Sequence, residues 1–70
     1  MAQQVQTKKA ILRRKQVEAR TGLSRSTIYL RIARGEFPAP ISLGARAVGW
    51  NSEDVQKWIA ERIAQSRKEA

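Results

Sequence analysis

The residues best suited to chemistry lie in one short stretch, residues 24–34, of this 70-residue chain. Three hydroxyl residues surround an arginine at its start, and a tyrosine and two further arginines follow. Hydroxyl and guanidinium groups donate hydrogen bonds to phosphate oxygens and to base edges. Small side chains also allow a helix to enter the major groove of DNA. No acidic residue interrupts the stretch, so its chemistry indicates binding of nucleic acid.

Each polar residue at the start of this stretch has a role expected at DNA. Arg25 is the expected base reader, because its guanidinium can pair with guanine through two parallel hydrogen bonds. Ser24, Ser26 and Thr27 are expected near phosphates, since a helix N-terminus favours anions; Ser24 also caps the helix. Tyr29 is expected either at a sugar or phosphate, or half-buried against a neighbouring hairpin.

Further candidate contacts lie around these residues. Leu30 shares the outward face of the predicted helix, and Arg34 either binds phosphate or complements the helix C-terminus. Arg14 and Lys15 belong to the basic start of the preceding helix. Arg46 is expected at a hairpin tip, where it either enters a minor groove, whose negative potential attracts arginine, or stays in solvent.

Composition narrows the classes of function. The chain has 14 Lys and Arg against 6 Asp and Glu, a formal net charge of +8, which favours a polyanionic partner. It has no histidine and no cysteine, so the commonest general base and the commonest metal ligand are missing and no plausible pair of nucleophile and base remains. We therefore expect neither an enzyme nor a cofactor. Apolar runs reach three residues at most. We therefore expect a cytoplasmic protein without a membrane segment.

Glycine and capping residues predict two short helices with a tight turn. The first helix ends at about residue 21, where Gly22 permits the left-handed stop. The second helix runs over residues 24–34 and ends at Gly35 by the same logic. Arg31 is expected at the edge of the core, next to an acidic residue or extended along the surface. The residues expected to close the core between these helices are Val17, Leu23, Ile28 and Ile32.

A small hairpin and a last helix should complete the domain. Apolar residues alternate on both sides of a glycine-bearing link, which predicts a two-stranded hairpin over residues 41–50. The residues expected on its packed face are Ile41, Leu43, Val48 and Trp50. The last helix begins at Asn51 or Ser52. Its buried stripe is expected to contain Val55, Trp58, Ile59, Arg62 and Ile63.

These elements predict a mostly α fold with a small β-hairpin, a winged helix-turn-helix. The spacing of Val17, Gly22, Leu23 and Ile28 is typical of a DNA-binding helix-turn-helix. The domain is expected over residues 11–65, between a flexible N-terminal arm at residues 1–10 and a frayed tail at residues 66–70.

Four segments resemble the AlpA family of phage and prophage regulators. They read LRRK at residues 12–15, TGLSRSTIY at 21–29, GEFPAP at 35–40 and RAVGW at 46–50. The resemblance implies a winged-helix relative of the MerR and excisionase DNA-binding domains, with helix 24–34 in the major groove and the hairpin beside it. Two positions depart from the family pattern. Arg13 replaces a capping Ser or Thr, and Leu30 precedes Arg31 where the family commonly has the arginine first.

The leading hypothesis is a sequence-specific DNA-binding regulator of phage or mobile-element type. The alternative is an excisionase-like recombination directionality factor that binds attachment-site DNA. Two other classes stay open: a basic RNA-binding protein and an adaptor for an acidic protein partner. No long heptad repeat is present, so we expect a monomer in solution that can associate with further copies on adjacent DNA sites.

Overall fold

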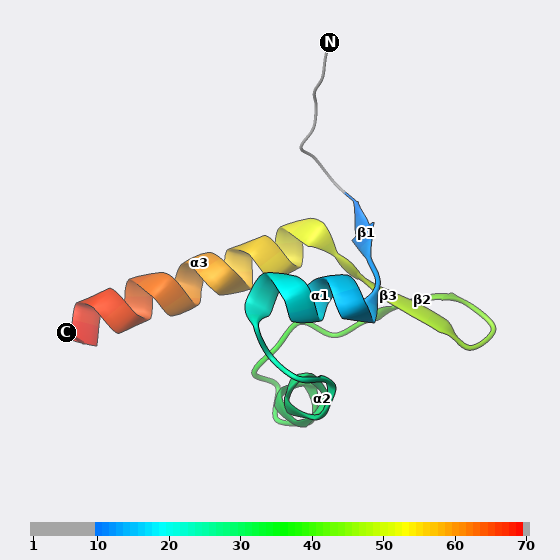
Figure 1. The fold of residues 1–70 in the computed structure, drawn as a ribbon, viewed down its shortest axis with the longest axis horizontal. Coiled ribbons are helices and arrows are strands. Elements are labelled where there is room, and N and C mark those ends of the chain that lie inside the picture. Colours follow the sequence, from blue (N-terminus) through cyan, green and yellow to red (C-terminus); the bar gives the residue numbers. More distant parts are fainter. Residues whose placement is uncertain (1–9, 70) are drawn as a thin grey trace, which may run out of the picture.

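The computed structural model describes residues 10–69 of the chain, so the predicted arm lies almost entirely outside the described residues. Three helices and three strands follow one another along the chain (Figure 1). They are β1 (Ile11–Leu12), α1 (Arg14–Thr21), α2 (Arg25–Ala33), β2 (Ile41–Gly44), β3 (Ala47–Asn51) and α3 (Ser52–Glu69). The predicted winged helix-turn-helix is confirmed.

The two short helices begin and end where the capping residues place them. Gly22 follows α1 with a φ of 75°, and Gly35 follows the end of α2 with a φ of 71°. Such left-handed conformations are easily adopted only by glycine. At the start of α1, the side chain of Gln16 accepts the Arg13 N–H at 2.8 Å. This bond defines the helix start although Arg13 stands where the family pattern has a capping hydroxyl.

The core lies where all three helices meet the sheet. Val17 of α1, Ile28 of α2, Trp50 of β3 and Val55 of α3 are completely buried. The predicted core residues Leu23 and Ile32 are partly buried against this cluster. The cluster also contains Leu12 and Phe37, which were not among the predicted core residues. One fully buried residue from each of four elements therefore fixes the position of α2 relative to the hairpin.

The sheet has three antiparallel strands in the order β1-β3-β2, one more than predicted. The additional strand is β1, whose Ile11 and Leu12 pair with Asn51 and Trp50 of β3. The Ser52 N–H also donates to the Ala10 carbonyl, and the Ala10 N–H donates to the Ser52 hydroxyl. β3 is therefore the central strand, paired along both edges.

Of the four residues predicted on the packed face of the hairpin, only Trp50 is buried, and Ile41, Leu43 and Val48 are exposed. Ile41 pairs with Gly49 and Ser42 pairs with Val48, with an irregularity between Ser42 and Gly44. Paired residues share a face of the sheet, so Ile41 lies on the face opposite Val48 and Trp50. The side chain of Leu43 also lies over Gly49. The extra residue at the bulge shifts the register by one, which moves a strand's side chains to the other face.

Gly49 is required by this packing. A Cβ atom at this position would lie 2.5 Å from Ile11 Cγ2 and 3.1 Å from both the Leu12 carbonyl oxygen and Leu43 Cδ1. We expect Gly49→Ala to lower the free energy of unfolding by about 1–3 kcal/mol, as overpacking does elsewhere. Urea denaturation measures this loss. Adding Ile11→Ala should restore part of the stability. If Gly49→Ala alone had the same free energy of unfolding as the wild type, that result would contradict the close approach of the three strands.

The last helix agrees with its predicted stripe only in its first half. Asn51 accepts the Glu53 N–H at 2.8 Å and so caps the helix start as expected. Val55 is buried, and Trp58 and Ile59 are half-buried, but Arg62 and Ile63 are exposed. Figure 1 shows why: α3 projects away from the body on the side opposite the hairpin. The helix also continues to Glu69, past its expected end near residue 65.

Candidate nucleic-acid interface

The exposed face of α2 is set by the burial of Ile28. Ile28 is completely buried, so residues one and two positions away on the helix turn outward. Tyr29 and Leu30 keep 38% and 51% of their surface exposed. In Figure 1, α2 is seen nearly end-on below α1, so the two helices cross steeply. The predicted site residues of α2 that are exposed are Ser24, Arg25, Ser26, Tyr29, Leu30 and Arg34, with Thr27 at intermediate burial.

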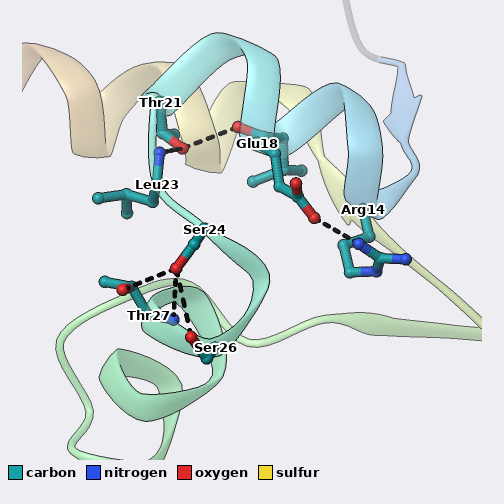
Figure 2. Close-up of polar contacts among 8 residues, drawn as sticks. Arg14, Glu18, Thr21, Leu23, Ser24, Ser26 and Thr27 are labelled. Carbon is teal, nitrogen blue, oxygen red and sulfur yellow. Dashed lines mark hydrogen bonds and ion pairs between the residues drawn. The ribbon is translucent and has the colours of Figure 1, made fainter.

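Three hydroxyl groups gather at the N-terminus of α2 (Figure 2). The Ser24 hydroxyl oxygen accepts the Thr27 N–H at 3.3 Å, which confirms its capping role. The same hydroxyl lies 3.0 Å from Thr27 Oγ1 and 3.3 Å from Ser26 Oγ. Hydroxyl hydrogens rotate freely, so this cluster can offer donors to an anion placed beyond the helix end.

Arg25 and Tyr29 contact one another on the exposed face. They are four residues apart on the helix, and the Arg25 guanidinium carbon lies 5.7 Å from the centre of the Tyr29 ring. The Tyr29 ring packs edge-on against Trp50 of β3, with ring centres 6.3 Å apart. Tyr29 therefore does pack against the hairpin, as one of its two expected placements requires. Together with Ser24 and Ser26, Arg25 and Tyr29 line a shallow hollow.

The turn between α1 and α2 is held by a residue that the sequence analysis did not single out. Thr21 donates its hydroxyl to the Val17 carbonyl at 2.8 Å and accepts the Leu23 N–H at 3.2 Å (Figure 2). The Gly22 N–H donates to the Glu18 carbonyl at 2.8 Å. These bonds fix the path of the turn and with it the angle at which α2 is presented. The sequence feature that indicates these bonds is a threonine directly before the glycine that ends a helix, because threonine side chains readily bond to nearby backbone groups.

The two basic candidates of α1 differ in their surroundings. Arg14 forms an ion pair and hydrogen bond with Glu18, one helical turn later (Figure 2). Both side chains are about one-third exposed, and such pairs contribute only a few tenths of a kcal/mol. Lys15 is exposed. A phosphate can therefore compete with Glu18 for Arg14, whereas Lys15 is available without a rearrangement.

The hairpin tip carries Arg46 in an unusual backbone conformation. Arg46 has a φ of 60°, the only positive φ of a non-glycine residue in the described part of the chain. This conformation costs a residue with a Cβ atom roughly 1–2 kcal/mol. The side chain is exposed, and the hairpin projects from the body (Figure 1). A strained position at an exposed tip is a recurrent feature of functional sites.

Charge is unevenly distributed over the chain. α2, β2 and β3 contain no acidic residue. Away from α1, the acidic residues lie in the segment after α2 or in α3: Glu36, Glu53, Asp54, Glu61 and Glu69. Three of them, Glu36, Asp54 and Glu61, line a groove beside Trp58. The α2 helix and the hairpin therefore carry basic side chains without acidic ones, which favours binding of a polyanion.

Arg31 turns away from the exposed face of α2. Its guanidinium lies 5.9 Å from the centre of the Trp58 ring, and that of Arg62 lies 5.7 Å from the same ring. Trp58 also packs against Phe37, with ring centres 4.9 Å apart. The expected placement of Arg31 at the core edge is confirmed, and of the two expected arrangements the structure shows the side chain extended over Trp58 rather than paired with a carboxylate.

Neither a membrane-spanning helix nor a metal-binding cluster occurs in residues 10–69. Every helix there is too short or too polar to cross a bilayer. No group of three or more acidic side chains in this region is arranged to hold a metal ion.

Comparison with known proteins assigns the family. The sequence profile described as prophage CP4-57 regulatory protein (AlpA) matches residues 10–63. An uncharacterized protein of Enterobacteria phage P4, ORF88, is 48% identical over 58 residues. The match covers 83% of this chain and 66% of the phage protein, so the chain spans just under two thirds of that relative's length. The matched region contains β1, α1, α2, the hairpin and the first two-thirds of α3. The chain therefore belongs to the AlpA family of prophage regulatory proteins.

Proposed function

We propose that this prophage regulatory protein acts by binding double-stranded DNA at specific sequences, with α2 in the major groove and the β2–β3 hairpin beside it. The observation that carries the proposal is the exposed face of α2. This face combines small hydroxyl residues, one arginine held by an aromatic ring and no carboxylate. Binding there would control transcription of phage or mobile-element genes, in the cytoplasm.

The dimensions of α2 and its angle to α1 support placement in the major groove. An α-helix with its side chains is about 10–12 Å wide, and the major groove is about 12 Å wide. Because α1 and α2 cross steeply (Figure 1), α2 can enter the groove while α1 crosses the DNA backbone. Small residues at the N-terminus of α2 permit the close approach that base contacts need.

The proposal assigns each exposed candidate one kind of contact. Arg25 reads a guanine, and Leu30 contacts a thymine methyl group, which is the apolar feature of the major groove. The remaining residues hold phosphates and so fix the register on the duplex without reading sequence. They are Ser24, Ser26, Thr27, Arg34, Arg14 and Lys15.

Arg46 is assigned to the minor groove or its phosphates next to the site of α2. We expect Arg46→Ala to weaken binding by a similar factor on every duplex and to reduce the slope of log K against log salt by about 1. Fluorescence anisotropy titrations at several salt concentrations measure both quantities. Arg67→Ala, which removes the same charge from the last turn of α3, is the matched control. Equal effects of the two variants would exclude a contact by the hairpin tip.

Selection from a library of random duplexes with the purified chain, near physiological salt, tests the proposal as a whole. We expect a defined site of one or two major grooves, bound at least about a thousandfold more tightly than random duplex. A site at a promoter identifies a transcription regulator, and phased sites at an attachment sequence identify a recombination directionality factor. Equal, salt-sensitive binding to all duplexes would contradict the proposal.

A further inference from the structure

We propose that Tyr29 is a positioning residue, which holds the Arg25 guanidinium in the orientation that reads a base and is itself held by Trp50. The inference rests on the proposed function, because it assigns a cause to the specificity of the α2 face. It also replaces the direct sugar or phosphate contact expected of Tyr29 from the sequence.

The contact between Arg25 and Tyr29 restricts a side chain that would otherwise move freely. The Arg25 guanidinium carbon lies 5.7 Å from the Tyr29 ring centre, within the range of a cation–π interaction. Among residues 10–69, Arg25 has no carboxylate partner. An exposed arginine loses much rotamer freedom when it pairs with a base, and a side chain already held in place loses less. The aromatic contact thus prepares Arg25 for binding.

The Tyr29 ring is in turn fixed by the core. Its partner Trp50 is completely buried, and the two rings meet edge to face at an interplanar angle of 63°. The Trp50 indole N–H donates to the Pro38 carbonyl at 3.0 Å, which sets the orientation of the indole. A continuous series of contacts therefore runs from the centre of the core to the guanidinium at the surface.

This arrangement distinguishes Arg25 from the other cationic candidates. In the part of the chain that the structure describes, three arginines lie over aromatic rings: Arg25, Arg31 and Arg62. Arg31 and Arg62 both lie over Trp58, beside the groove that contains acidic residues. Arg25 is thus the arginine that is both held by a ring and located on the acid-free face of α2.

Two substitutions at position 29 separate positioning from direct contact. Tyr29→Phe keeps the ring, and Tyr29→Leu keeps apolar packing against Trp50 without a π face. The readout is the ratio of affinities for the selected site and for the same site altered at the base pair that Arg25 reads. We expect Tyr29→Phe to preserve this ratio and Tyr29→Leu to reduce it by about two- to fivefold. Affinity for random duplex and its salt slope should stay unchanged in both variants.

A double-mutant cycle and a measurement without DNA complete the test. In an Arg25→Ala background, Tyr29→Leu should cause no further loss of the ratio, because the two residues act as one unit. In NMR spectra of the free chain, the Arg25 side-chain protons should show a ring-current shift in the wild type and in Tyr29→Phe, and lose it in Tyr29→Leu. Thermal unfolding confirms that each variant is folded.

Three results would overturn the inference. Tyr29→Phe reducing the affinity ratio as strongly as Tyr29→Leu would assign the effect to the hydroxyl. A ratio unchanged in Tyr29→Leu would overturn the inference alone and leave the proposed function intact. A wild-type chain without any preference among duplexes would overturn the proposed function as well, whether or not the ring-current shift is observed.

Discussion

The Arg25→Ala variant is expected to bind the selected DNA site about 5- to 150-fold more weakly than the wild-type chain, a loss of about 1–3 kcal/mol. Preference should relax at one base pair, because the remaining α2 contacts still hold the helix in register. The cause is the loss of the paired hydrogen bonds that a guanidinium offers to guanine. Competition titrations with duplexes altered at single positions measure the affinity and the position of the change.

Two matched variants separate base reading from charge. Arg25→Lys keeps the positive charge but loses the fork of parallel donors, and we expect it to lose preference at the same base pair while retaining affinity for random duplex. Arg67→Ala removes one charge from the far end of α3 and should leave the preference intact. If Arg25→Ala weakened binding to all duplexes by one factor, Arg25 would be a phosphate contact and α2 would lack its main base reader.

Trp50→Ala is expected to remove a large part of the free energy that keeps the domain folded. Removing a fully buried tryptophan costs about 3–5 kcal/mol, and a domain of this size has a total stability of only about 4–10 kcal/mol. Trp50 is completely buried and contacts Tyr29. The substitution also deprives the Pro38 carbonyl of its indole donor. Circular dichroism during urea denaturation measures the loss of stability.

The second tryptophan provides the control. Trp58 is only half-buried, and its indole N–H donates to the Glu36 carbonyl at 2.9 Å, so Trp58→Ala removes a similar volume at less cost. We expect this variant to remain folded at 25 °C, with a clearly smaller loss of stability. Equal losses for the two tryptophans would show that Trp50 is not the centre of the core.

The helices were predictable because their signals are local. Gly22, Ser24 and Gly35 determine helix ends through backbone conformation and a single capping bond, and each does so in the structure. The inward face of α2 also follows from spacing alone, since the burial of Ile28 decides which neighbours are exposed. Arg25 lies three residues before Ile28, so spacing predicts it on the flank of the outward face, and the structure shows its side chain exposed there.

The hairpin was predictable as an element but not in its register. Without the bulge at Leu43, Ile41 and Leu43 would share a face with Val48 and Trp50, as the alternation indicated. The bulge inserts one residue and moves Ile41 to the opposite face. β1 escaped prediction for a related reason, because a strand of two residues has no period and is defined only by its distant partners Trp50 and Asn51.

Two other features could not be predicted because they depend on how the elements are arranged in three dimensions. The stripe along α3 is regular in sequence, but Ile63 is exposed because the helix projects past the core there. The spacing of Arg25 and Tyr29 indicates that they are neighbours on one helix. The support of Tyr29 by Trp50, however, joins residues from different elements, and only the tertiary structure reveals it.

The central claim, that α2 reads DNA in the major groove through Arg25, is tested most directly by methylation interference on the selected site. Dimethyl sulfate methylates guanine at N7 in the major groove and adenine at N3 in the minor groove. We predict that N7 methylation of one guanine blocks binding of the wild-type chain and has no further effect on Arg25→Ala, because N7 is an acceptor for the arginine fork. Interference confined to adenine N3, or none at any guanine, would contradict the account.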